Sequence, residues 1–232
     1  SNRGHELLLM SCAAIIVAAG HGHRMGFDKM LAPLGGRPVL QWSLDAFLQA
    51  GEIDTVVVVT SEERFAQLDP GTEKPVLRAD GDRERFLSVM RGLDAIPSPT
   101  PSHVAVHDGA RPLIQPAQID EVIRASRDDG AAALAHRVTE TLKKADDQGV
   151  TQRSVPREDL WIMETPQAFR FKILHRAYQV TESQRLGVTD DVSAVEAIGI
   201  PTKLIENPLP NPKITVPQDL TLAEAIMHVR KA

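Results

Sequence analysis

An uninterrupted apolar run at residues 12–19 (CAAIIVAA) limits the folds open to this chain more than any other part of its sequence. A strand that is buried on one face alternates apolar and polar side chains, so a continuous run indicates burial on both faces. Strands of that kind belong to parallel sheets that helices cover on each side. Residues 55–60 (TVVVVT) have the same character. The sequence therefore predicts an α/β fold around a mainly parallel sheet.

Helical and extended patterns alternate along most of the remaining chain. Further strands are predicted at residues 76–79, 103–107, 131–138 and 203–205. Helices are predicted from Pro38 to a stop at Gly51, around residues 86–93, around residues 119–123 with an end at Gly130, and over residues 171–179, 191–198 and 217–229. Such alternation is typical of Rossmann-like sheets with right-handed crossovers and helices on both faces.

One segment, residues 139–160, departs from this alternation. A turn signal at residues 146–149 (DDQG) separates two short extended stretches, which predicts a protruding β-hairpin arm. A two-stranded ribbon is barely stable alone, so the arm is expected to pack against something, and a second copy of the chain is one such partner. At roughly 150 residues per domain, we expect one domain over residues 11–232, with residues 1–10 as a leader outside the fold.

Charge and cysteine content exclude several classes of function. The formal net charge of −5 argues against broad attraction to nucleic acid or to an anionic membrane, so any anionic ligand needs a local group of cations. A single cysteine, Cys12, excludes an internal disulfide framework and a cysteine-rich zinc site. No stretch approaches the ~20 apolar residues that cross a bilayer. We expect a cytoplasmic protein with neither a nucleic-acid nor a membrane partner.

Ligands of open α/β sheets bind beyond the carboxyl ends of the strands, here the loops after residues 19, 60, 80, 107 and 138. The first loop (AAGHGHRMGFDK, residues 18–29) carries three glycines and the cations Arg24 and Lys29, which favours a polyphosphate ligand. The dinucleotide pattern fails because the third glycine is one place late, and the P-loop pattern fails because Met30 follows Lys29. A glycine-rich turn with solvated cations is the alternative.

The other candidate residues have structural as well as functional interpretations. Asp108 follows a strand and could hold a sugar hydroxyl or Mg²⁺, or form an Asx-turn or helix cap. Arg111 could fork onto phosphate oxygens, whereas His107 is expected to be a hydrogen-bonded core histidine. Thr165 precedes a proline, which predicts extended backbone. Thr189 or Asp190 is a predicted helix cap.

Eight short motifs occur in a fixed order: AAGxGxRM, GDRERFLSV, VHDGARP, TETLKK, REDLW, ETPQAF, TDDVSAVE and NPKITVPQDL. Together they resemble the cytidylyltransferases that act on 2-C-methyl-D-erythritol 4-phosphate in the non-mevalonate isoprenoid pathway, from about Cys12 to the end of the chain. The resemblance implies a nucleotidyltransferase domain, a Mg²⁺ cofactor, and CTP and a polyol phosphate as substrates. The ribitol 5-phosphate cytidylyltransferases share the scaffold, and a non-catalytic CTP-binding sensor on it is a further alternative.

The resemblance also implies roles for individual residues. Cytosine and ribose would be recognised by Ala18, Ala19, Gly20, Gly81 and Ser88, with Asp108 at the nucleotide sugar and the metal. The catalytic cations would be Arg24, Lys29 and Lys213. The polyol phosphate would be surrounded by Arg111, Thr141, Arg157, Thr165, Thr189 and Lys213. The family uses its hairpin to form a homodimer, in which Thr141 and Arg157 reach the partner's site.

The chain departs from the family pattern at several positions. Asp28-Lys29-Met30 stands where Pro-Lys-Gln is usual, Asp82 replaces the second glycine of the base loop, Glu140 replaces an aspartate before the arm threonine, and Pro156 stands where aspartate is common. A carboxylate at position 28 would repel a triphosphate unless it is turned outward. Asp28 and Asp82 are therefore the two features that favour the sensor alternative.

Overall fold

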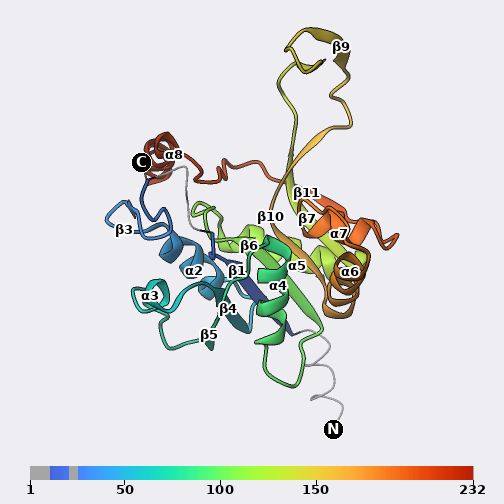
Figure 1. Cartoon of the computed structure of the whole chain (residues 1–232). Coiled ribbons are helices and arrows are strands. Elements are labelled where there is room, and N and C mark those ends of the chain that lie inside the picture. Colours follow the sequence, from blue (N-terminus) through green and yellow to red (C-terminus); the bar gives the residue numbers. More distant parts are fainter. Residues whose placement is uncertain (1–10, 21–25, 232) are drawn as a thin grey trace.

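A computed structural model describes residues 11–20 and 26–231 of the chain (Figure 1). Seven of the described strands form one sheet in the order β11-β7-β10-β6-β1-β4-β5. Their bounds are β1 Cys12–Val17, β4 Thr55–Val59, β5 Val76–Ala79, β6 His103–Asp108, β7 Ala131–Arg137, β10 Trp161–Arg170 and β11 Lys203–Glu206. Only the pairs that include β10 are antiparallel. The predicted mainly parallel α/β fold is confirmed.

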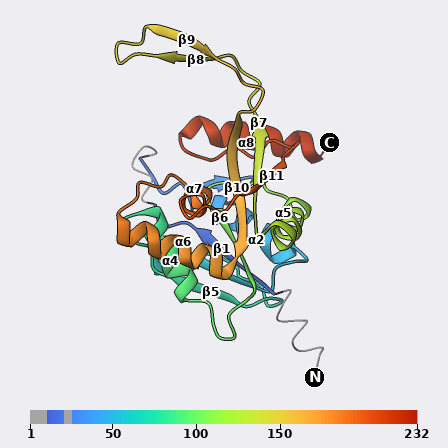
Figure 2. The ribbon, with the colours of Figure 1, turned by 90° about the vertical axis from the view of Figure 1, so that its right-hand side faces the viewer.

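Helices cover both faces of the sheet (Figure 2). One face carries α2 (Val39–Gln49) and α5 (Pro116–Asp129), and α8 (Pro217–Lys231) adds side chains to the same core. The other carries α4 (Arg85–Asp94), α6 (Phe171–Gln184) and α7 (Asp191–Glu196). A short helix, α3 (Glu62–Phe65), follows β4. None of the described helices has the length and apolar character that a bilayer-spanning helix requires.

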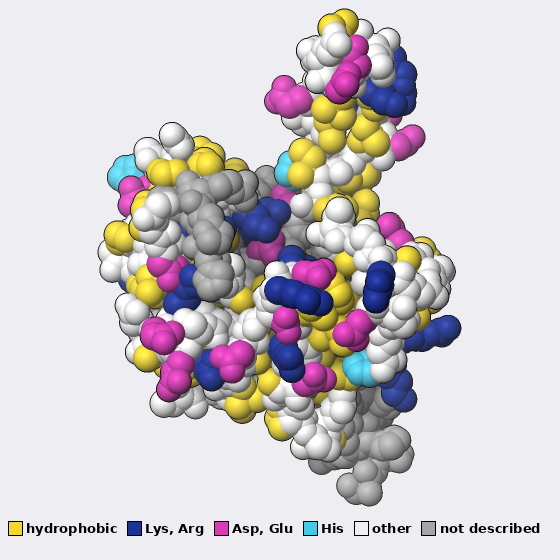
Figure 3. Space-filling view, in the orientation of Figure 1, with side chains coloured by type: hydrophobic (Ala, Val, Ile, Leu, Met, Phe, Trp, Pro, Cys, Tyr) yellow, Lys and Arg dark blue, Asp and Glu magenta, His cyan; other side chains and the backbone are white. Residues whose placement is uncertain are grey.

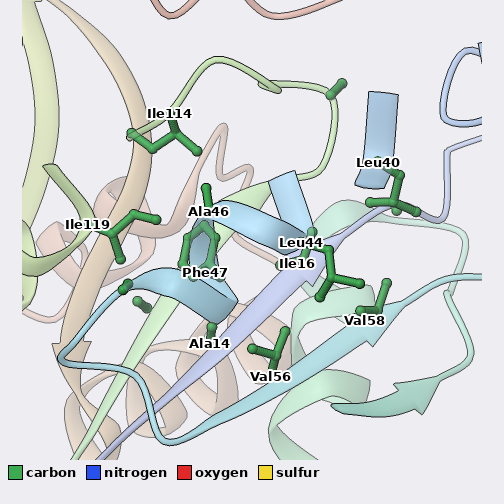
Figure 4. Packing of buried hydrophobic residues seen from close by; sticks show 14 of the residues in the cluster. Ala14, Ile16, Leu40, Leu44, Ala46, Phe47, Val56, Val58, Ile114 and Ile119 are labelled. Carbon is green, nitrogen blue, oxygen red and sulfur yellow. The ribbon is translucent and has the colours of Figure 1, made fainter. Parts of the chain in front are cut away.

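Burial on both faces explains why the central strands do not alternate in polarity. Ala14 and Ile16 of β1 pack with Phe47 of α2 on one side of the sheet (Figure 4), whereas Ile15 packs into the core on the other side. All three β1 residues are fully buried. Burying each isoleucine contributes about 1.5–3 kcal/mol, so two-sided burial makes β1 the centre of the fold.

The arm is a separate two-stranded sheet, β8 (Leu142–Ala145) with β9 (Thr151–Val155), between β7 and β10. It projects away from the body of the molecule (Figures 1 and 2). The Asp146 side chain accepts hydrogen bonds from the backbone N–H groups of Gln148 and Val150, at 3.1 and 2.8 Å, and closes the turn. The hairpin predicted within residues 139–160 is therefore confirmed.

The sequence pattern missed β10, although it predicted extended backbone around Thr165. The register of β10 against β7 shifts between Met163 and Gln167, so the strand carries an irregularity in its middle. Proline lacks an N–H and is tolerated at such a bulge, which is why Pro166 does not exclude a strand here. The short α3 and the two-residue strands β2 (Pro33–Leu34) and β3 (Arg37–Pro38) were also not predicted.

Candidate active site

Two pockets meet at the carboxyl ends of the parallel strands. The larger, about 850 Å³, is lined by residues that follow β1, β4, β5 and β6, and the smaller measures about 440 Å³. They share Arg85, Asp108 and Lys213. Figure 3 shows basic and acidic side chains gathered in the hollow between the body and the arm. Four of the five predicted loops reach the larger pocket, whereas the loop after residue 138 leads into the arm.

Asp108 lies at the boundary of the two pockets. It is the last residue of β6 and pairs in register with Val17 at the end of β1. Its carboxylate accepts from Lys213 Nζ at 2.8 Å and from Arg85 Nε at 3.1 Å. Burial alone raises the pKa of Asp108, but the charges of Arg85 and Lys213 outweigh burial and hold the pKa well below its usual value. The Asp108 carboxylate is therefore ionised at neutral pH.

Arg85 is fixed between the pockets by a second carboxylate. Its two terminal nitrogens donate to Asp191 at 2.8 and 2.9 Å, and the Tyr178 hydroxyl donates to the same carboxylate. Burial lowers the pKa of Arg85, but Asp191 and Asp108 raise it by more, so the guanidinium stays charged. The sequence reasoning missed Arg85, although it lies inside the quoted motif GDRERFLSV.

On the wall of the larger pocket the loop after β1 packs directly against the loop after β5. A Cβ atom built on Gly81 would lie 2.1 Å from the Cβ of Ala19, which leaves room only for glycine. Ser88 Oγ accepts from the Asp82 N–H at 2.9 Å and holds the second loop in place. Ala19, Gly20, Gly81 and Ser88 all line the pocket. Ala18 does not, because its side chain is buried and its N–H donates to the Val59 carbonyl.

Lys29 and Lys213 both line the larger pocket, whereas the predicted cation Arg24 lies outside the described residues. Lys29 Nζ donates to the Ile214 carbonyl at 3.0 Å. The Ile214 N–H in turn donates to the Ala110 carbonyl at 2.8 Å, which fastens the Lys213 segment to the loop after β6. Lys29 and Lys213 are 184 positions apart in the sequence, and the hydrogen bonds of the Ile214 backbone bring them to the same pocket.

The two acidic departures from the family pattern are both paired with arginines. Asp28 accepts from Arg64 Nε at 2.5 Å, and Asp82 lies 3.3 Å from a terminal nitrogen of Arg91. The backbone N–H of Arg83 and the Arg91 side chain lower the pKa of Asp82. Neither carboxylate faces a phosphate site without a compensating cation, which removes the observation that favoured a non-catalytic sensor.

Thr165 lines the smaller pocket with a hydroxyl that is already engaged. Oγ1 accepts from the Asp108 N–H at 3.0 Å and lies 3.0 Å from His107 Nδ1. His107 Nε2 lies 3.1 Å from the Arg111 carbonyl, which only accepts, so Nε2 donates and Nδ1 accepts from Thr165. Burial lowers the pKa of His107 to about 4. His107 is thus the hydrogen-bonded core histidine that was expected.

The guanidinium group of Arg111 donates to backbone carbonyls of the protein. Its terminal nitrogens donate to the carbonyls of Asn211 at 2.8 Å and Met163 at 3.4 Å, so the expectation of a fork on phosphate does not match this arrangement. Arg111 still lines the smaller pocket, as does Thr189. Of the two predicted caps of α7, Asp190 is the one that accepts from Ser193 N, at 2.9 Å.

Thr141 and Arg157 lie in the arm and line neither pocket of their own chain. Both are exposed, and Arg157 donates to the Thr139 carbonyl. Among the described residues there is also no group of three or more metal-ligating side chains. Mg²⁺ commonly takes one or two protein carboxylates together with substrate phosphates, and the Asp108 carboxylate, at the junction of the pockets, fits that mode.

Comparison with known proteins agrees with this geometry. Residues 12–229 match the family model described as IspD, 2-C-methyl-D-erythritol 4-phosphate cytidylyltransferase. The enzyme of that name from Prochlorococcus marinus is 40% identical over 221 residues, which cover 93% of this chain and 98% of the relative. Its counterpart from Pelotomaculum thermopropionicum is 39% identical over 227 residues, which cover 94% of this chain and 95% of the relative.

Solved structures agree as well. The 4-diphosphocytidyl-2C-methyl-D-erythritol synthase of Anaerococcus prevotii superposes with a TM-score of 0.82 at 28% identity, over 95% of this chain and 97% of its own. The Thermus thermophilus 2-C-methyl-D-erythritol 4-phosphate cytidylyltransferase superposes with a TM-score of 0.78 at 32% identity, over 94% of this chain and 100% of its own. This chain belongs to the 2-C-methyl-D-erythritol 4-phosphate cytidylyltransferase family.

Proposed function

We propose that this chain transfers the cytidylyl group of CTP to 2-C-methyl-D-erythritol 4-phosphate, which yields 4-diphosphocytidyl-2-C-methyl-D-erythritol and pyrophosphate for isoprenoid biosynthesis. Family membership supports the reaction. The observation that carries the mechanism is the meeting of two pockets at Arg85, Asp108 and Lys213. A two-substrate transfer needs two adjoining sites with charge compensation at their junction.

The chemical difficulty is electrostatic. The acceptor phosphate attacks the α-phosphorus of CTP, and both partners are anions. Two unit charges ~4 Å apart repel by roughly 4 kcal/mol at an effective dielectric constant near 20. The attacking phosphate monoester needs no general base, because its second pKa of about 6 leaves it ionised at neutral pH. The protein therefore has to position the two phosphates and compensate their charge.

The larger pocket is assigned to CTP. The pocket wall that Ala19 and Gly81 form where they pack together, which Ser88 supports, is assigned to contact the nucleoside, and Lys29, which lines the same pocket, is assigned to the triphosphate. Arg24, from the same glycine-rich loop, is assigned to the triphosphate on the family resemblance. The smaller pocket, with Thr189 and Arg111 on its wall, is assigned to the polyol phosphate.

Lys213 is assigned to the reacting phosphates, because it lines both pockets. Its ammonium group lies 2.8 Å from the Asp108 carboxylate, so it stands where negative charge would gather on the five-coordinate phosphorus. Arg85 and Asp191 hold the Asp108 carboxylate in place. A bound Mg²⁺ would neutralise triphosphate charge, and Asp108 is the side chain assigned to hold it.

The arm is assigned to dimerisation. Thr141 and Arg157 are exposed and line neither pocket of their own chain, which is consistent with a role in the site of a partner subunit. A two-stranded ribbon is marginally stable without further packing, and a dimer interface would supply that packing. The protein is accordingly proposed to be a homodimer with two composite sites.

Pyrophosphate release from CTP tests the function. Purified protein is assayed with 2-C-methyl-D-erythritol 4-phosphate and, separately, with ribitol 5-phosphate. We expect turnover with the first acceptor, and about a hundredfold loss of kcat in Lys213→Ala, comparable with the loss of one preorganised donor. Lys172→Ala, an exposed lysine at the start of α6, is the matched control and should retain full activity. Turnover with ribitol 5-phosphate alone would contradict the assignment.

A further inference from the structure

Arg64 is a buried arginine that the reaction as described does not use. It lies in α3, directly after β4, and is 8% exposed. Its guanidinium makes three contacts in three directions. Nη1 donates to the Ala18 carbonyl at 2.6 Å, Nη2 donates to the Gly20 carbonyl at 3.1 Å, and Nε donates to Asp28 Oδ2 at 2.5 Å. These contacts span the two described sides of the glycine-rich loop.

We propose that Arg64 is a positioning residue for CTP, which acts by joining Ala18–Gly20 to Asp28 and by keeping the Asp28 carboxylate away from the triphosphate. The inference rests on the proposed function, in that CTP occupies the larger pocket. It concerns a residue that touches neither substrate, because Arg64 is not among the residues that line that pocket.

The contacts orient the backbone that leads into the loop. Carbonyl oxygens that point toward the pocket would repel phosphate, whereas those of Ala18 and Gly20 are directed at Arg64, inside the protein. The Thr60 hydroxyl also donates to the Ala18 carbonyl, at 3.4 Å. The close approach of Ala19 to Gly81 depends on the position of this same backbone. Arg64 therefore positions the part of the pocket wall that is assigned to contact the nucleoside.

The ion pair between Arg64 and Asp28 neutralises the Asp28 carboxylate. This residue directly precedes Lys29, which lines the pocket, so an unpaired carboxylate at position 28 would stand within the ~8 Å screening length of the triphosphate. In the structure Oδ2 accepts from Arg64 and Oδ1 accepts from the Met30 N–H at 3.0 Å. Both oxygens of Asp28 are thus engaged on the protein side.

Only arginine supplies this combination of contacts. A guanidinium donates in a planar fork from three nitrogens, and it can serve two carbonyls and a carboxylate at once. A lysine ammonium is a point charge on a flexible stem, and it would pair with Asp28 without holding both carbonyls. Arg64→Lys is therefore expected to be an intermediate variant, with part of the CTP affinity retained.

The test has two measurements: calorimetry gives the Kd for CTP without acceptor or turnover, and steady-state pyrophosphate release gives the KM for methylerythritol phosphate. Arg64→Gln should raise the Kd for CTP about tenfold or more, as expected for the loss of hydrogen bonds from a charged group, and leave the KM for methylerythritol phosphate within about twofold. Asp28→Asn should bind CTP as well as the wild type or better. The double variant should recover about threefold or more of the affinity lost in Arg64→Gln, because the unpaired charge is gone.

Arg127→Gln is the matched control. Arg127 is a largely buried arginine that is ion-paired with Glu52. Glu52 lies just before the amino end of β4, whereas the pocket lies at the carboxyl ends of the strands. Its replacement should lower the melting temperature without a change in the Kd for CTP. A general loss of stability is thereby separated from a loss of nucleotide positioning.

Each other outcome overturns a stated part of the inference. If the wild type binds CTP and Arg64→Gln binds it equally well, Arg64 does not position the nucleotide, although the proposed function stands. If Arg64→Gln weakens both substrates alike and behaves as Arg127→Gln does in melting, its role is structural only. A double variant no better than Arg64→Gln would overturn the role of Asp28. A wild type that binds no CTP would overturn the proposed function and this inference with it.

Discussion

Replacement of Gly81 by alanine is the perturbation whose size the structure fixes most directly. The added Cβ would lie 2.1 Å from the Cβ of Ala19, whereas ordinary contacts between such atoms begin at 3.4 Å. One of the two loops must therefore move by about 1.3 Å, the difference between these two distances. Ala19 follows the central strand β1, so the mobile partner is the loop that carries Gly81, and this movement shifts the wall of the larger pocket.

A displacement of about 1 Å at a positioning group costs on the order of a hundredfold in rate, which corresponds to about 2.7 kcal/mol at 1.36 kcal/mol per factor of ten. We therefore expect Gly81→Ala to lose about a hundredfold in kcat/KM for CTP, with the KM for methylerythritol phosphate little changed. Steady-state release of pyrophosphate, with each substrate varied in turn, measures both quantities.

The control is Gly187→Ala. No atom lies within 4 Å of a Cβ built on Gly187, so this variant tests the same chemical change without the clash. It should match the wild type in rate and in melting temperature. The reasoning fails if Gly81→Ala keeps its kcat/KM for CTP within about threefold of the wild type, because the contact between the two loops would then tolerate a side chain at position 81.

Burial lowers the pKa of His107 from 6.5 to about 4, so neutral His107 contributes roughly 3 kcal/mol of stability above pH 6.5 that is lost as the pH falls toward 4. The free energy of unfolding in urea should therefore fall more steeply with decreasing pH in the wild type than in His107→Asn. Equal pH dependence in the two proteins would refute this prediction. Mixing inactive Arg157→Ala with inactive Lys29→Ala should restore some activity if the arm completes the partner's site, and no recovery under confirmed subunit exchange would mean that each chain builds its own. Chelation by EDTA should abolish turnover and Mg²⁺ should restore it, whereas activity that survives EDTA would exclude the assignment of a metal to Asp108.

Local patterns predicted most of the fold because the forces that form these elements act over short stretches of sequence. The apolar runs of β1 and β4 and the DDQG turn of the arm each carry enough information by themselves. The middle of β10 does not, because its polar residues and Pro166 are accommodated by an irregular register against β7. That accommodation depends on neighbours that lie more than twenty residues away in the chain.

The residues of the candidate site also fall into two groups, those that local sequence could identify and those that it could not. Asp108, Lys29 and Lys213 could be singled out because they follow predicted strands or lie in recognisable motifs. Arg85 and Arg64 could not be assigned roles, because Arg85 pairs with Asp191 across 106 positions and Arg64 pairs with Asp28 across 36. A charged side chain looks the same in a sequence whether it is solvated or buried against a carboxylate.

A two-sided parallel sheet, a projecting hairpin and a cation-bearing loop at the carboxyl ends of the strands could be predicted from local patterns, since these features depend on the periodicity and spacing of nearby residues. The pairing of the charges became evident in the folded protein: Asp28 and Asp82 are neutralised by Arg64 and Arg91, and Arg85 and Lys213 converge on Asp108. The reason is physical. The free energy of an ion pair depends on the distance between its charges and on their exposure to water, and both are set when the chain folds.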